Sequence, residues 1–125
     1  MSSTTQVCIP TADPALSPAN VATAVLANAL TVKAQNSAHK GAGTVYGIGG
    51  YTTTTQFIQI HDTLAAPTAG AVPKFVIPIT ANQPFSIDFG IYGLPMLNGI
   101  FITNSTTGPT LTAGAADTFM NVRYL

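Results

Sequence analysis

The sequence predicts an all-β fold: an antiparallel β-sandwich of seven or eight strands, jelly-roll-like, with an extended N-terminal arm. Within Val72–Gly90, apolar residues alternate with other residues on both sides of a short break, as in two half-buried strands. Turn-forming residues recur at intervals of about 10 to 15 residues, which is typical of β-sandwiches. Eight short strands favour a jelly roll over an immunoglobulin-like topology. We therefore expect an arm over residues 1–20 and one β-sandwich domain over residues 21–125.

Residues 1–20 are expected to be extended because prolines recur at every fourth position, at Pro10, Pro14 and Pro18. Proline interrupts helices and central strands alike. Within this arm, Gln6–Ile9 is a candidate for one short edge strand. Two interpretations stay open: an unattached terminus, and an arm that docks on a neighbouring molecule.

The segment Asn20–Ala34 also has two interpretations. Its valines and alanines suit a helix capped by Asn20. Its final five residues have the composition of a strand instead. Because the remainder of the chain has an all-β pattern, we predict a strand from about Asn28. The polar and glycine-containing stretch Gln35–Gly43 is predicted to be a loop.

Two further strands are predicted over Thr44–Tyr51 and Thr55–Asp62, with three threonines at residues 52–54 joining them as a hairpin. The first of these strands contains three glycines within Gly47–Gly50. Glycine inside a strand indicates a bulge or the close approach of a neighbouring backbone.

The stretch Val72–Gly90 has the clearest strand pattern and is expected to seed the core. Its alternating apolar residues are Phe75, Ile77 and Ile79 before the turn, and Phe85, Ile87 and Phe89 after it. The turn at Ala81–Pro84 predicts that the two strands are joined by a short loop and lie side by side as a pair. The other expected elements are a crossing loop over Thr63–Ala71, a loop or broken strand over Ile91–Asn98, a strand over Gly99–Asn104, a connection over Ser105–Gly114 and a last strand over Thr118–Tyr124.

The composition indicates a surface that is covered by other molecules. Hydrophobic residues make up 46% of the chain, and charged residues only 6%, against about 25% in an ordinary soluble domain. The formal net charge is zero. So few charges of either sign favour association over mutual repulsion. We therefore expect much of the surface to face other subunits.

Several classes of partner and compartment are disfavoured. The four basic residues are scattered and form no basic stripe, so nucleic acid is not an expected partner. No apolar run approaches the roughly 20 residues needed to cross a bilayer. The N-terminus lacks the pattern of a secretory signal. The single cysteine, Cys8, cannot form an internal disulfide, so synthesis in a cytoplasm fits.

No residue is predicted to be catalytic, metal-binding or cofactor-binding, and the chain is not expected to be an enzyme. His61 and Asp62 are adjacent in a predicted strand, so their side chains point to opposite faces, and His61 is expected at the surface. No nucleophile elbow is present. No zinc or calcium spacing occurs among the residues of the relevant types, which are Cys8, Asp13, His39, His61, Asp62, Asp88 and Asp117. The four tyrosines, Tyr46, Tyr51, Tyr92 and Tyr124, are expected to fill strands rather than to line a sugar site.

From about Leu30 to Leu125 the order of motifs resembles a group of small structural proteins of tailed phages. The motifs that carry the resemblance are LTVKA at 30–34, VYGIGGY at 45–51, FIQIHD at 57–62, AAPTAGAVP at 65–73, FVIPI at 75–79, NGIFITNSTTGPT at 98–110 and DTFMNVRYL at 117–125. Residues 1–20 fall outside the pattern, and Leu94–Met96 departs from it. The resemblance implies a β-sandwich and a role in capsid decoration or cementing. It implies no catalytic residues.

The resulting expectation is a bacteriophage structural protein, a capsid decoration or cement protein that binds the outside of the head and stabilises capsomer contacts. Its expected partners are the major capsid protein and further copies of itself, as a homotrimer or homodimer. It would be located in the virion after synthesis in the host cytoplasm. The arm and one loop end of the sandwich are the expected contact regions. The alternative is a head-fibre or tail adhesin component that binds host surface glycans.

Overall fold

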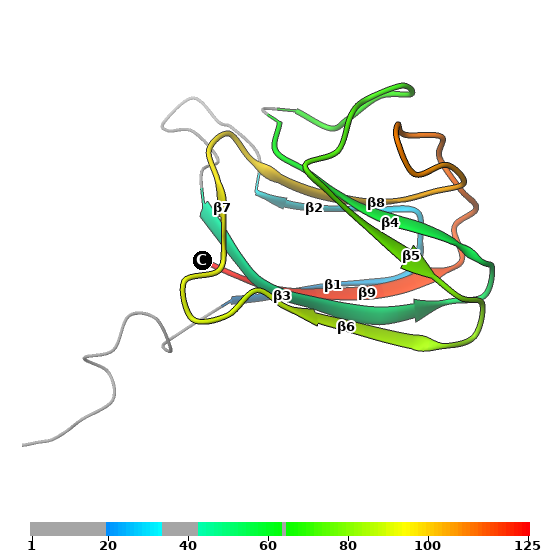
Figure 1. The fold of residues 1–125 in the computed structure, drawn as a ribbon, viewed down its shortest axis with the longest axis horizontal. Helices are drawn as coiled ribbons and strands as arrows, with labels where there is room; N and C mark the ends of the chain where they lie inside the picture. Colours follow the sequence, from blue (N-terminus) through cyan, green and yellow to red (C-terminus); the bar gives the residue numbers. More distant parts are fainter. Residues whose placement is uncertain (1–19, 34–42, 64) are drawn as a thin grey trace, which may run out of the picture.

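Two antiparallel sheets face each other in the computed structural model, which describes residues 20–33, 43–63 and 65–125 (Figure 1). The strands in these ranges are β1 (Asn20–Ala27), β2 (Ala29–Lys33), β3 (Gly43–Thr52), β4 (Gln56–His61), β5 (Phe75–Ile79), β6 (Pro84–Asp88), β7 (Leu94–Met96), β8 (Ile100–Ser105) and β9 (Thr118–Tyr124). The described residues contain no helix. The predicted all-β sandwich is therefore confirmed, with nine strands in the described residues where seven or eight were expected, because β1 was not predicted as a strand and the short β7 lies where a loop or broken strand was expected. The predicted arm lies outside the described residues up to its last position, Asn20, which begins β1.

The strand order is nested. One sheet has the order β1-β9-β3-β6, and β7 pairs with β3 beyond the end of β6; the other has the order β2-β8-β4-β5. Early strands thus pair with late ones: β1 with β9, β2 with β8, β3 with β6 and β4 with β5. A long antiparallel hairpin wound into two layers has this order, which is compatible with the expected jelly-roll-like arrangement.

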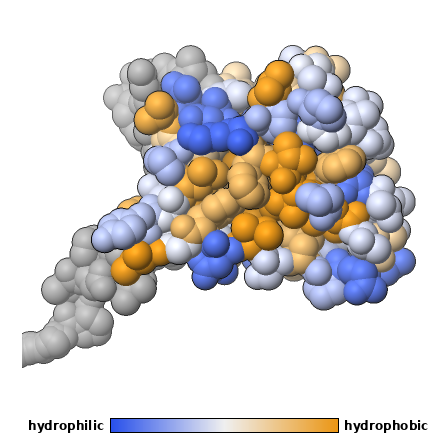
Figure 2. Space-filling view, viewed as in Figure 1, coloured by the Kyte–Doolittle hydropathy of each residue, from blue (hydrophilic) through white to orange (hydrophobic). Residues whose placement is uncertain are grey.

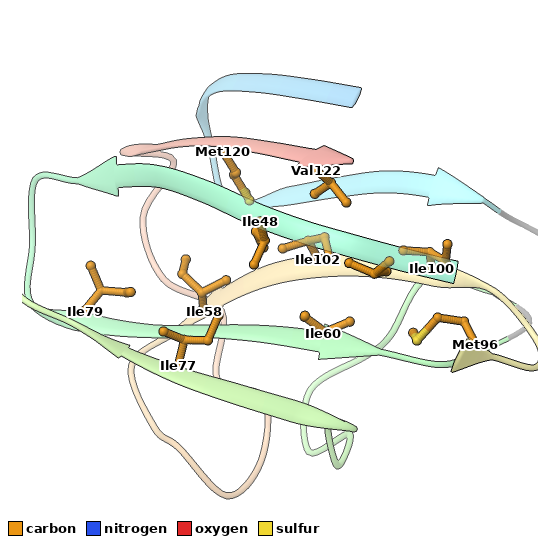
Figure 3. Close-up of a cluster of buried hydrophobic side chains, with 11 residues drawn as sticks. Ile48, Ile58, Ile60, Ile77, Ile79, Met96, Ile100, Ile102, Met120 and Val122 are labelled. Carbon is orange, nitrogen blue, oxygen red and sulfur yellow. The ribbon is translucent and has the colours of Figure 1, made fainter. Parts of the chain in front are cut away.

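The core lies between the sheets and consists mainly of isoleucine (Figure 3). Ile58 and Ile60 of β4 alternate with residues on the outer face, and Ile100 and Ile102 of β8 do the same; all four are fully buried. The opposite sheet contributes Val45, Ile48, Met120 and Val122. Burying a side chain of this size stabilises the fold by about 1.5–3 kcal/mol, so the period-two pattern of the strands is what holds the two layers together.

Two expected hairpins are wrong. The strands before and after Ala81–Gln83 are β5 and β6, but β5 pairs with β4 in one sheet, and β6 pairs with β3 in the other. The threonine connection between β3 and β4 likewise crosses from sheet to sheet. The two crossings meet at one end of the sandwich, where the Asn82 N–H donates to the Thr52 carbonyl at 2.7 Å. Alternation shows that one face of a strand is buried, and strands that face each other satisfy it as well as strands that pair.

The strand predicted from about Asn28 is confirmed as β2, but the residues before it form a further strand, β1, where the sequence offered only a helix. Ala22 and Ala24 pair with Val122 and Met120 of β9. The pairing becomes irregular between Ala24 and Ala27, and the chain then crosses to the second sheet and forms β2. Alanine favours a helix in isolation, but β9 offers a ladder of hydrogen bonds and a buried face, and this tertiary contact overrides the propensity.

The glycine-rich part of β3 behaves as predicted. The register between β3 and β9 shifts between Val45 and Gly47, as at a β-bulge. Gly50 has a φ of 146° and lies against the backbone of Phe119. Only glycine combines that backbone conformation with so close an approach.

Candidate interaction surface

One end of the sandwich is closed by hydrogen bonds to the carboxylate of Asp117. It accepts hydrogen bonds from Thr54 Oγ1 at 2.7 Å, from Gln56 Nε2 at 3.0 Å and from Thr53 Oγ1 at 3.1 Å. Burial opposes ionisation, but hydrogen bonds from Thr54, Gln56, Thr53 and Thr118 outweigh it and hold the pKa of Asp117 below 3.8. The carboxylate thus joins the crossing between β3 and β4 to the start of β9.

Beneath Asp117 lies a layer of buried polar side chains, Thr52, Gln56, Asn104 and Thr118. Asn104 Nδ2 donates to Thr118 Oγ1 and to the Ala115 carbonyl, both at 2.8 Å. Because the donors and acceptors of this layer are paired with one another, the layer serves packing and is not an open binding site.

Asp62 has a similar structural role at the other end of β4. Its carboxylate accepts hydrogen bonds from the N–H groups of Asn98 at 2.7 Å, Leu97 at 3.0 Å and Gly99 at 3.3 Å. Lys74 Nζ lies 3.6 Å away. Burial raises the pKa of Asp62. The three hydrogen bonds and the charge of Lys74 lower it by more than burial raises it, so the pKa lies below 3.8. The ionised carboxylate fixes the turn between β7 and β8.

His61 is not at the surface, contrary to the sequence prediction. It is fully buried on the outer face of β4, and its Nε2 lies 3.0 Å from Thr103 Oγ1. Its neighbour on that face, Gln59, donates to the carbonyls of Thr107, Gly108 and Thr110. The connection between β8 and β9 therefore covers this face, as the orange segment in Figure 1 shows. Alternation predicts that the His61 side chain points to the outer face of β4 but not that this face is buried.

Lowering the pH is expected to destabilise the protein through His61. Burial lowers its pKa below 6.5 in the folded protein, so the unfolded chain binds the proton first. The stabilising effect of the neutral side chain is complete above pH 6.5 and is lost as the pH falls from that value toward the folded pKa. Urea unfolding measured from about pH 7.5 to about pH 5 should show this loss, which His61→Gln should reduce. His39→Gln is the control, and an equal reduction there would contradict the assignment.

The candidate metal-binding residues do not come together in the part of the chain that the structure describes. No group of three or more His, Cys, Asp or Glu side chains gathers in these ranges, and Cys8, Asp13 and His39 lie outside them. The carboxylates of Asp62, Asp88 and Asp117 are engaged in three separate turns. The tyrosines do not gather at one place either, because Tyr51 and Tyr124 lie toward opposite ends of the sheet by their register on β3.

Large apolar side chains are exposed at the end of the sandwich opposite Asp117. We call this region the arm end, because residues 1–19 join the sandwich there. Its exposed side chains are Val21 (64%), Ile91 (54%), Tyr92 (89%), Leu97 (69%) and Leu125 (42%). Asn20 of β1 pairs with Tyr124, and Leu125 exchanges two backbone hydrogen bonds of 2.9 Å with Thr44. Single exposed apolar residues are normal on protein surfaces, but a group of this kind at one place marks an interaction surface.

The side of the sandwich between β5 and β6 is also apolar. These two strands are the outermost strands of different sheets and do not pair with each other. Half-buried Phe75 and Phe89 contact each other edge to face there, with ring centroids 5.1 Å apart. Figure 2 shows the hydrophobic area across this side. Phe75 and Phe89 thus keep part of their rings open to solvent on this side, as in a surface that meets another molecule.

The sequence prediction of a loop end as a contact region named no residues. A usable signal was present: Ile91, Tyr92 and Leu97 are large apolar residues in a segment whose glycines and proline indicate turns. Apolar side chains in a turn do not belong to the buried face of a strand, so they are expected to be exposed.

No helix in the described parts of the chain is long and apolar enough to span a membrane. Comparison with protein-family models, with curated proteins and with solved structures returned no match.

Proposed function

We propose that the protein is a structural component of a bacteriophage particle, a capsid decoration or cement protein that binds the outside of the head through its arm end. The observation that carries the proposal is the group of large exposed apolar side chains at that end, in a chain with four acidic and four basic residues among 125. Removing such a surface from water costs little desolvation free energy, because few charges lose their hydration. The motif resemblance supplies the phage context.

Binding to the assembled shell alone would stabilise it by mass action. Each occupied site adds RT ln(1 + [L]/Kd) to the free energy of the assembled state. The proposed partners are the major capsid protein and further copies of this chain, as a homodimer or homotrimer on local symmetry axes, where weak contacts multiply. The proposed location is the virion.

Replacing Tyr92 and Leu97 together with serine is expected to weaken binding to phage heads at least about tenfold, since each substitution removes an apolar side chain worth about 1.5 kcal/mol or more when buried. The measurement is co-sedimentation of each variant with phage heads. The heads come from the phage that encodes the protein and have been stripped of their own copies of it. Leu26→Ser is the matched control, because Leu26 is 64% exposed but lies between Ala24 and Ala27, toward the Asp117 end of β1. Unchanged binding by the double variant, or equal weakening by the control, would contradict the proposal.

A head-fibre or tail adhesin that binds host glycans is the second candidate. The ring of Tyr51, 46% exposed, stacks on that of Phe119 with centroids 5.9 Å apart and an interplanar angle of 10°. An exposed aromatic face of this kind suits a sugar ring. Glycan-array binding by the isolated protein, with no binding to heads, would favour this candidate.

A further inference from the structure

The two sheets have four edges, one of them shared by β6 and the short, proline-containing β7, and these edges differ in how they are protected against pairing with another strand. An unprotected edge offers free N–H and C=O groups to any extended chain, and proteins block it with proline, charge, irregularity or short length. The edge strand β5 contains Pro78, and β6 begins with Pro84 and ends with Asp88. The third edge strand, β2, is five residues long, irregularly paired and ends at Lys33.

The fourth edge, β1, has almost none of these devices. It is eight residues long and has neither a proline nor a charged residue. Its only irregularity lies after Ala24, where Leu26 has a positive φ of 49°. The regular part, Asn20–Ala24, pairs with β9 on one side and has no strand on the other among the described residues. Val21 and Val25 are more than 60% exposed.

We infer that β1 pairs antiparallel with β1 of a second copy across a two-fold axis, which joins the two larger sheets into one. The other edges each carry a proline, a charge or both, so β1 itself is the edge best suited to receive β1. A strand paired with its own copy antiparallel generates a closed two-fold dimer, whereas pairing with a different edge would give a ring or a filament.

The side chains select the register. With Thr23 on the axis, Val21 of each copy faces Val25 of the other on the outer face, while Ala22 faces Ala24 on the core side. Pairs of β-branched residues on one face stabilise antiparallel strands. Placing the axis at Ala22 or at Ala24 instead, which shifts the register by two residues, would leave the valines facing threonine, alanine or the chain before Asn20.

Charge does not oppose the pairing. Among the described residues, the charged side chain on the strand next to the seam is that of Arg123 on β9, which pairs with Val21. Its counterpart in the second copy would be three strand spacings away, about 14 Å, which exceeds the screening length of about 8 Å at physiological ionic strength. The two copies of Asn20, the first residue of β1, would lie at opposite ends of the seam. A seam of five residue pairs is small for an interface, and we expect a dimer that dissociates on dilution.

The test is the mass of the full-length protein in solution, by sedimentation velocity over a range of concentrations. The wild-type chain should change from monomer to dimer as the concentration rises. Thr23→Lys should raise the dimer dissociation constant at least about tenfold, because two like charges would face each other on the axis. Ser86→Lys, at an exposed site on the edge strand β6, is the matched control and should leave the dimer unchanged.

Charge complementation tests the axis itself. Thr23→Asp should also be monomeric, and an equimolar mixture of the Thr23→Lys and Thr23→Asp chains should dimerise again. Circular dichroism melting of each variant checks that the outward substitution leaves the fold intact. A wild-type chain that stays monomeric at every concentration would overturn the inference. So would a dimer that Thr23→Lys leaves unchanged, or a mixture of folded variants that does not reassociate.

Discussion

Replacing Gly50 with alanine is expected to lower the free energy of unfolding by about 3 kcal/mol or more, or to prevent folding altogether. A Cβ at this position would overlap the carbonyl oxygen of Phe119 and lie 2.9 Å from its carbonyl carbon. The obstacle is backbone and cannot rotate away. Gly50 pairs with Met120 on one side and Phe85 on the other, so movement of β3 would break the sheet at its centre. The φ of 146° adds conformational strain for any residue with a Cβ.

Gly90→Ala separates the two contributions. Gly90 has a positive φ of 82°, but a Cβ there would meet nothing within 4 Å. This control should therefore lose only the conformational part, about 1–2 kcal/mol. Urea unfolding of both variants, together with their soluble yield, measures the difference. Equal losses would show that Gly50 is needed for its backbone conformation and not for the close approach of β9.

Ile102→Ala is expected to cost about 2–5 kcal/mol, a large share of the roughly 5–15 kcal/mol by which a domain of this kind is stable. Ile102 is fully buried at the centre of β8. It pairs with Leu30 of β2 and Ile60 of β4, and Figure 3 shows it facing Ile48 of the opposite sheet. Truncation leaves a cavity between two rigid layers that cannot collapse without breaking strand pairs.

Ile91→Ala deletes the same atoms at a site that is 54% exposed. This control is expected to change the free energy of unfolding by no more than about 0.5 kcal/mol. Chemical unfolding of both variants provides the comparison. A loss for Ile102→Ala no larger than for Ile91→Ala would mean that the space between the sheets is not the core.

The strands that could be predicted from the sequence are those with a local signal. Thr118–Tyr124 was predicted with the bounds that β9 has, and the first predicted strand of the central stretch lies at β5. In each, the two-residue repeat of apolar side chains reflects the geometry of a single strand, in which successive side chains point to opposite faces. The same holds for the glycines of β3, because a residue without a Cβ is needed wherever a neighbouring backbone comes close.

No local sequence signal shows which strands pair with each other, or that the outer face of β4 is buried. Alternation around Ala81–Gln83 is the same whether the flanking strands pair or face each other, and only the presence of β3 and β4 places β6 and β5 in different sheets. His61 is buried on the outer face of β4, where Thr103 of the neighbouring strand β8 lies 3.0 Å from its ring, and no local pattern marks that face as covered. The sequence by itself determined the all-β class, most strands and the sparsely charged surface, since these depend on residue type and spacing. The tertiary structure alone decided the pairing, the fate of His61 and the exposed arm end, because these depend on which distant segments meet.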